Sequence, residues 1–271
     1  MFAVKGCARA DGEEHVNVLA PGARAAGPAA ACLGAALLAA ACGILSGSSS
    51  TSSGPPATVR PAATQAPANR IASKPPAQIL AAAARALASA SSVHVKGTVR
   101  ESGRWYTFDL VLGRASAKGS MTAPVLGIKK AQFDFVATAG KLFIRSTTLW
   151  RKVGGAAAAQ LLNNRWVLLP KAAVRGFPFR GIRAFARLIQ SGSQGKPRRA
   201  GAVTMINGGP AIPVRSGDAI VYVATTGRPF PLRVMPATHA AGAGVVDFTA
   251  YNAPVTIGPP PNAVDFNQLH G

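Results

Sequence analysis

A cysteine that follows a short apolar run is the residue with the clearest chemistry in this sequence. Residues 29–41 carry no charge and no strongly polar side chain, and Cys42 follows directly. An uncharged run of this length suits the core of a secretory leader, which has roughly 7 to 15 residues, whereas a membrane span needs about 20. The small side chains of Ala40 and Ala41 let a peptidase approach the backbone, and the thiol can take a lipid such as palmitate. The pattern predicts a lipoprotein signal peptide over residues 1–41 and acylation of Cys42.

Two other interpretations of the leader stay open, namely a cleaved soluble export signal and an uncleaved N-terminal anchor. Ala39 stands where such cleavage sites most often carry leucine. Asp11, Glu13 and Glu14 are unexpected in a leader that should begin basic. We therefore expect that the natural translation start lies downstream of Met1.

The remaining candidates for catalysis and metal binding are few. After Cys42 the chain offers His94, His239 and His270, one glutamate and five aspartates, and none of them has the spacing of zinc ligands. Ser193 and Lys196 match the Ser-x-x-Lys of penicillin-binding enzymes, but the partner motifs of those enzymes do not follow. We expect no catalytic residue, no metal site, no cofactor and no enzymatic activity.

The charge of the chain favours anionic partners. Thirty Lys and Arg against nine Asp and Glu give a net charge of +21. The cations are scattered and aromatic residues do not alternate with them, so that nucleic acid is not an expected partner. GC-rich coding bias explains the same composition without any partner. Acidic lipid head groups and acidic polymers stay open as partners of an exported chain.

Composition divides the chain after the leader into two parts. Residues 42–76 are rich in Ser, Thr, Pro, Ala and Gly, and they bury too little apolar surface to repay the entropy of ordering. We interpret them as a lipidated, disordered tether. Residues 77–271 alternate apolar runs with turn signals and are long enough for one domain with a real core. No cysteine follows Cys42, so packing alone must hold this domain.

The hydrophobic periodicity of residues 77–271 predicts a mainly β (α+β) fold. A helical spacing covers residues 77–90, and a period of two follows it. Short helices are expected at residues 155–163 and 180–190. We expect a large curved antiparallel sheet that forms a half-open barrel, with the N-terminal helix and the two inserted helices against its concave face. The predicted strands cover residues 93–99, 106–112, 118–122, 131–137, 141–145, 202–206, 212–215, 219–224, 230–235 and 245–249.

Several segments together resemble a known family. They are residues 88–98, 140–145, 165–167, 227–233 and 246–255, and in this order they are similar to the actinobacterial LprG/LppX-type lipoproteins. The resemblance covers roughly residues 77–266. It implies a LolA-like half-barrel that holds the acyl chains of lipids or glycolipids in an apolar cavity. Fold transfers across such a resemblance better than cargo does.

The expected function is that of a membrane-anchored, exported lipoprotein that binds or carries an amphiphile and is anchored on the extracytoplasmic side of the cell membrane. The alternative is an envelope sensor or scaffold that binds a protein partner. The stripe of Arg180, Arg183 and Arg187 is expected to contact head groups, unless it is a solvated helix face. The apolar residues expected to contact acyl chains, unless they fill a closed core, are Val95, Val99, Phe108, Leu110, Phe133, Phe135, Leu142, Ile144, Phe185, Ile189 and Phe248.

Overall fold

The computed structural model describes residues 4–7, 15–18, 66–101, 103–191, 195–238 and 244–269 of the 271-residue chain. Cys42 and most of the predicted signal peptide and tether lie outside these residues. Residues 66–76, which were predicted to belong to the disordered tether, pack on the domain instead, because Ile71 is buried in the cluster with Ile79 and Ile212. Strands β1 (Val4–Cys7) and β2 (His15–Val18) pair with each other in a separate two-stranded sheet.

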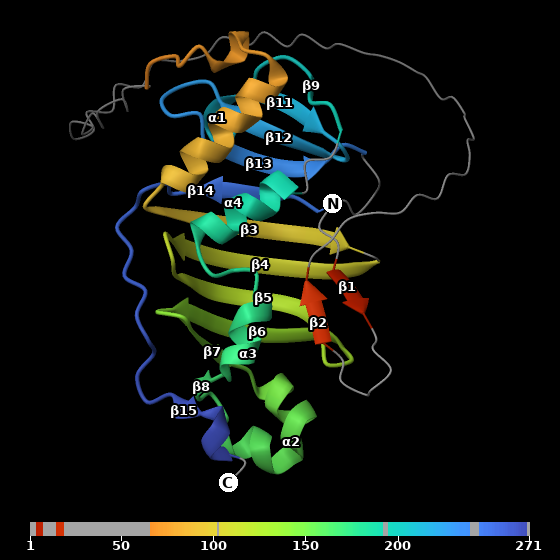
Figure 1. Ribbon diagram of the computed structural model, residues 1–271, viewed down its shortest axis with the longest axis vertical. Coiled ribbons are helices and arrows are strands. Elements are labelled where there is room, and N and C mark those ends of the chain that lie inside the picture. Colours follow the sequence, from red (N-terminus) through yellow and green to blue (C-terminus); the bar gives the residue numbers. More distant parts are fainter. Residues whose placement is uncertain are drawn as a thin grey trace, which may run out of the picture. The chain divides into compact units, whose positions relative to one another are not determined.

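The domain is built on one open, mixed sheet (Figure 1). Thirteen strands of the described residues belong to it, and its order runs β10-β11-β12-β13-β14-β3-β4-β5-β6-β7-β8-β15, with β9 also pairing with β11. The pairs are antiparallel except for β8 with β15. In chain order the strands are β3 (Ser92–Glu101), β4 (Arg104–Gly113), β5 (Ala117–Val125), β6 (Ile128–Thr138), β7 (Lys141–Arg145), β8 (Val167–Leu168), β9 (Arg198–Arg199), β10 (Thr204–Ile206), β11 (Gly209–Ser216), β12 (Ala219–Ala224), β13 (Pro231–Pro236), β14 (Val246–Thr249) and β15 (Val264–Asp265).

The helices contain fewer residues than the strands of this sheet. Figure 1 shows α1, α3 and α4 in front of one face, which we call the helix-bearing face. Helix α1 packs on α4 and on β11, β12 and β13, and α3 packs on β7. The helices are α1 (Pro76–Ser89), α2 (Thr147–Leu161), α3 (Lys171–Gly176) and α4 (Ile182–Ser191), with short 3-10 turns η1 (Ile71–Ser73) and η2 (Phe266–Leu269).

The alternation of apolar and polar residues along the strands determines which face of the sheet contributes to the core. In β4, Phe108, Leu110 and Leu112 are buried, whereas Asp109 and Val111, which alternate with them, are more exposed. This is the signature of a strand with one covered face and one wet face. A second, smaller cluster lies under α1, where Ile79 and Ala83 pack on β11 and β12. The prediction of a mainly β sheet with few helices is therefore confirmed.

Two glycines on the helix-bearing face allow neighbouring strands to approach closely. A Cβ atom built on Gly97 would lie 2.1 Å from the carbonyl oxygen of Val245, and one on Gly119 would lie 2.1 Å from that of Asp109. Both contacts are with backbone, which cannot move aside as a side chain can. Such approaches are typical of points where a sheet bends or coils.

The structure differs from the sequence prediction mainly in short elements. The helix expected at residues 155–163 begins at Thr147, because the Ser146 hydroxyl caps it by accepting from the Leu149 N–H. Gly154 and Gly155 then interrupt it with non-helical backbone angles. Helix α3 and strands β8, β9 and β15 were not predicted. These strands have two residues each, which is too short for a period to appear.

We expect Gly97→Ala to destabilise the domain by roughly 3 kcal/mol or more, because the new methyl group would overlap backbone that cannot relax cheaply. Gly258→Ala is the matched control, since a Cβ atom there would meet nothing within 4 Å. Chemical denaturation followed by circular dichroism measures both variants. Equal stability of the two variants would contradict the close approach of β3 and β14.

Candidate functional site

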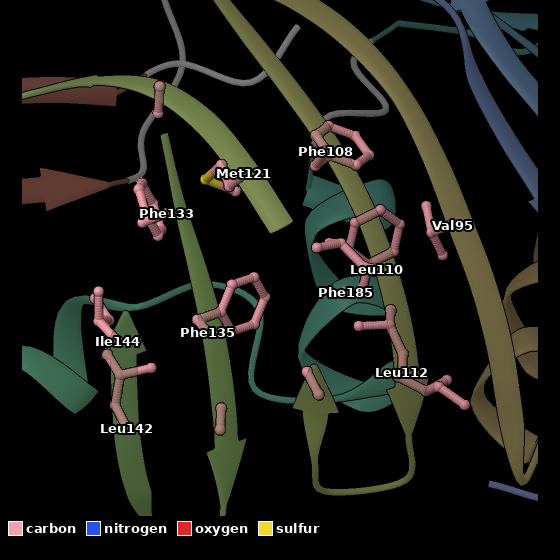
Figure 2. Close-up of a cluster of buried hydrophobic side chains, with 14 of the residues drawn as sticks. Val95, Phe108, Leu110, Leu112, Met121, Phe133, Phe135, Leu142, Ile144 and Phe185 are labelled. Carbon is pink, nitrogen blue, oxygen red and sulfur yellow. The ribbon is translucent and has the colours of Figure 1, made fainter. Parts of the chain in front are cut away.

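The helix-bearing face gathers most of the apolar residues that the sequence singled out. Figure 2 shows Val95, Leu110, Phe135 and Phe185 among the side chains that meet there. They come from β3, β4, β6 and α4, and Phe248 joins them from β14 through its ring contact with Phe185 at 5.8 Å. The sequence pattern thus predicted which residues share this face.

These side chains are packed by protein atoms on nearly every side. Their exposed fractions lie between 0 and 8%, which leaves little space for water beside them. Val99 is half-buried against the same cluster, and the Ile189 side chain lies outside the described residues. The expectation that they contact acyl chains stays a prediction. The residues with these small exposed fractions are Val95, Phe108, Leu110, Phe133, Phe135, Leu142, Ile144, Phe185 and Phe248.

Two phenylalanines that the sequence analysis did not select complete the cluster. Phe177 and Phe179 lie in the connection between α3 and α4. The ring of Phe177 meets that of Phe135 edge to face at 4.7 Å, and the ring of Phe179 lies 5.8 Å from Phe108 and 6.0 Å from Phe185. Both rings are only half-buried. We call residues 177–179 the aromatic plug.

The plug had one signal in the sequence. It is the tripeptide Phe177-Pro178-Phe179, which stands between Gly176 and Gly181. Gly181 has φ +137°, and a Cβ atom there would lie 2.8 Å from the carbonyl oxygen of Arg114. The connection is therefore held at Gly181 against the turn between β4 and β5. Between Gly176 and Gly181 the backbone has no regular secondary structure.

Helix α4 is amphipathic beside the plug. Ile182, Phe185 and Ala186 are buried, whereas Arg183 and Arg187 are exposed on the other side. Arg180 is exposed just before the helix begins. The predicted stripe of three arginines is thus present on the surface, and its contact with head groups stays a prediction.

The opposite face of the sheet is polar around His94 of β3. The Nε2 atom of His94 lies 2.6 Å from Oδ1 of Asp109, and the Lys96 ammonium lies 3.0 Å from Oδ2. The hydrogen bond with His94 holds the pKa of Asp109 below its ordinary value, against the opposing effect of burial, and Lys96 acts in the same direction. Nδ1 of His94 lies 3.2 Å from Oγ1 of Thr249. His94 therefore points outward, as its place in the alternation predicts.

Two open hollows lie beside polar residues. One, of about 340 Å³, has Lys96, Asp109 and Thr122 in its lining. The other, of about 390 Å³, includes Asp134 and Arg145, which form an ion pair at 2.8 Å. Neither hollow is lined mainly by the residues of the apolar cluster. In the described part of the chain, no group of three or more His, Cys, Asp and Glu could hold a metal ion.

The described residues contain no helix that combines the length and the hydropathy needed to cross a membrane. Other residues singled out in the sequence lie outside the described parts, namely Ser193, His239 and His270.

Comparisons with known proteins give structural likeness at low sequence identity. No protein-family model and no curated protein matches the chain. The chain is similar to the crystal structure of LprF from Mycobacterium bovis, with 16% identity and a TM-score of 0.47 over 72% of this chain and 99% of that one. It is also similar to lipoprotein LppX from Mycobacterium tuberculosis, with 15% identity and a TM-score of 0.40 over 67% of this chain and 99% of that one. The likeness to these two structures concerns the fold alone.

Proposed function

We propose that this protein is a non-catalytic carrier or binding protein for an amphiphile, whose acyl chains take the place of the aromatic plug against the helix-bearing face. The observation that carries the proposal is the contrast between the plug and what lies beneath it. The underlying side chains are fully apolar and buried, whereas Phe177 and Phe179 are half-exposed and belong to a connection without regular structure. Removing such a connection from its place costs less than opening paired strands.

Exchange of the plug for an acyl chain replaces one apolar contact with another. The plug rings contact Phe108, Phe135 and Phe185, and an alkyl chain in their place would bury the same surfaces. A ligand that binds only when the plug is displaced has a lower apparent affinity, because only the fraction of molecules with a displaced plug can bind it. The plug therefore sets the affinity for cargo as well as the stability of the empty protein.

Replacing both plug rings, in Phe177→Ala/Phe179→Ala, tests the exchange. We expect the full chain to bind a fluorescent fatty acid at least about tenfold more tightly, since the competing rings are gone. The empty protein should lose roughly 3 kcal/mol of stability, because half-buried rings cost somewhat less than core rings. Fluorescence titration measures the affinity, and native mass spectrometry identifies lipid that co-purifies.

The matched control for the plug variant is Phe230→Ala. Phe230 is also half-buried and stacks on Tyr251 at 4.0 Å, but it makes no ring contact with the plug. Its removal should lower stability without tightening fatty-acid binding. Absence of probe binding by both the parent and the plug variant, together with an absence of co-purified lipid, would refute the carrier function. The protein-binding alternative would then stand.

That alternative has one observation in its favour. Val203 and Met205 lie at the edge strand β10, with exposed fractions of 47 and 60%. Exposed apolar residues on an edge strand suit pairing with another chain. A protein partner at β10 and an amphiphile under the plug occupy different parts of the sheet.

The arginine stripe is proposed to hold the anionic head group of the cargo. It stands on the exposed side of α4 while Phe185 of the same helix contacts the plug ring of Phe179. Charge reversal in Arg183→Glu/Arg187→Glu should lower the affinity for an anionic amphiphile by about tenfold at low salt and by less at high salt. A neutral amphiphile of the same chain length should be unaffected.

The control for the arginine variant is Lys196→Glu/Arg198→Glu, which makes the same charge change on exposed residues near β9. Titration of both double variants at low and moderate salt separates a local effect from the change in net charge. Equal weakening in the two variants would leave the stripe as a solvated helix face.

We also propose that acylation of Cys42 anchors the chain on the outer face of the cytoplasmic membrane. One acyl chain binds a membrane only marginally, so stable attachment needs two or more. The segment 42–65 would give the domain a reach of roughly 25 Å from this anchor, because residues 66–76 pack on the domain through Ile71. In Cys42→Ala the protein should leave the membrane fraction or keep its leader, whereas Cys32→Ala should behave as the parent. Correct processing and unchanged fractionation of Cys42→Ala would contradict the anchor.

A further inference from the structure

Two hairpin turns stand side by side at one end of the sheet. The first joins β3 to β4 and the second joins β5 to β6. Because β4 pairs with β5 along most of their length, both turns project from the same end, at the right-hand edge of the sheet in Figure 1. We call the described residues of these two turns, 100, 101, 103–105 and 125–130, the hairpin tip.

The hairpin tip combines exposed apolar side chains with cations. Trp105 is 39% exposed and Leu126 is 52% exposed. Glu101 is the acidic residue in these two segments. The Arg100 guanidinium lies 5.9 Å from the centre of the Trp105 ring. The cations of the tip are all exposed, and they are Arg100, Arg104, Lys129 and Lys130.

Leu126 is also in a backbone conformation that suits it poorly. Its φ is +52° and that of Gly127 is +75°, so both central residues of the turn are left-handed. Asparagine followed by glycine is the favoured pair for such a turn, and this chain uses Asn207 and Gly208 between β10 and β11. A side chain with a Cβ atom costs about 1 to 2 kcal/mol in the left-handed region, and leucine lacks the polar group that lets asparagine compensate.

Leu126 therefore carries two free-energy costs in water. One comes from its left-handed backbone conformation and the other from its exposed apolar surface. Strain of this kind persists where the surroundings or the function require the residue. An apolar phase beyond the end of the hairpin would remove the second cost. The neighbouring tryptophan and the cations identify that phase, since Trp is favoured at membrane interfaces and Lys and Arg are attracted to acidic lipids.

We propose that the hairpin tip is a docking surface for an anionic lipid bilayer. Leu126 and Trp105 enter the interface between head groups and acyl chains, and the four cations lie among the head groups. This contact is separate from the proposed cargo site, because the tip residues lie at strand ends and the plug lies between α3 and α4. Docking would hold the end of the sheet on the membrane whether or not an amphiphile is bound under the plug.

The test compares two turns with the same backbone pattern at opposite ends of the sheet. Leu126→Asn and Ala139→Asn each place asparagine before glycine, since Ala139 and Gly140 also have positive φ, +49° and +69°. Ala139 lies between β6 and β7, at the end away from the hairpin tip. Both variants should be slightly more stable than the parent because asparagine suits the turn. Only Leu126→Asn should lose membrane contact.

The measurement uses the full chain on vesicles of phosphatidylcholine and phosphatidylglycerol with brominated acyl chains. Quenching that disappears in Trp105→Phe reports contact of Trp105 with the bilayer, because the other two tryptophans, buried Trp150 and half-buried Trp166, are present in both proteins. We expect Leu126→Asn to lower the ratio of docked to undocked tips about fivefold, the effect of withdrawing roughly half a leucine side chain from an apolar phase. Ala139→Asn should match the parent.

A second variant tests the charge of the partner. Lys129→Gln/Lys130→Gln should reduce docking on vesicles with phosphatidylglycerol by about tenfold or more, since each cation near an acidic surface contributes about 1 kcal/mol. If the parent is quenched equally on vesicles with phosphatidylglycerol and on vesicles of phosphatidylcholine alone, the preference for an anionic bilayer is wrong. Quenching in the parent no greater than in Trp105→Phe, or unchanged in Leu126→Asn, would overturn docking by the tip. None of these outcomes depends on whether fatty acid binds under the plug.

Discussion

The domain depends on one constraint, which is that an open sheet with a single apolar face must be covered by segments of its own chain. No disulfide bond can form within the described residues, because Cys7 is the one cysteine among them. Helix α1 covers β11, β12 and β13. Helices α3 and α4 and the aromatic plug pack against the apolar cluster of β3 to β7. The close approaches at Gly97 and Gly119 bring neighbouring strands near enough to bend the sheet around these covers. Burial of apolar surface is thus the main source of stability.

The same constraint explains why an amphiphile is a reasonable cargo. A cover made of paired strands or a long helix is expensive to remove, because backbone hydrogen bonds are lost with it. The plug is a cover of another kind, since it contributes rings and almost no backbone pairing. Under the proposed function, a sheet covered in this way would exchange the plug side chains for the acyl chains of a ligand while its strands stay paired.

The sequence predicted the frame well because the alternation of residues such as Val95, Phe108 and Leu110 is long and regular. It predicted β12 and β7 to the residue, since clear turns flank both strands. It did not predict the start of α2, where the cap at Ser146 is a single side chain in a polar context. Pairing of β8 with β15 joins residues about 100 positions apart, and no local pattern reveals such a pairing.

Within the candidate site, the sequence predicted the buried residues of the strands but did not predict the aromatic plug that packs on them. Phe135 and Phe248 follow the strand period, so their common face could be inferred. Phe177 and Phe179 follow no period, because they belong to a connection whose shape is set by tertiary contacts such as that of Gly181 with Arg114. Leu126 was hidden for a similar reason, since its positive φ is a property of the turn.

The position of β3 in the sheet has a consequence for how the chain acquires its fold. Residues 94–97 of β3 pair with residues 246–249 of β14, and this seam joins the two halves of the sheet. The meander from β3 to β7 can form as its residues emerge, since each strand pairs with the next. The seam must wait until nearly the whole chain has been made, and closing so long a loop slows folding. Until that moment one side of β3 is an unpaired edge, and the nascent chain is open there to pairing with other strands.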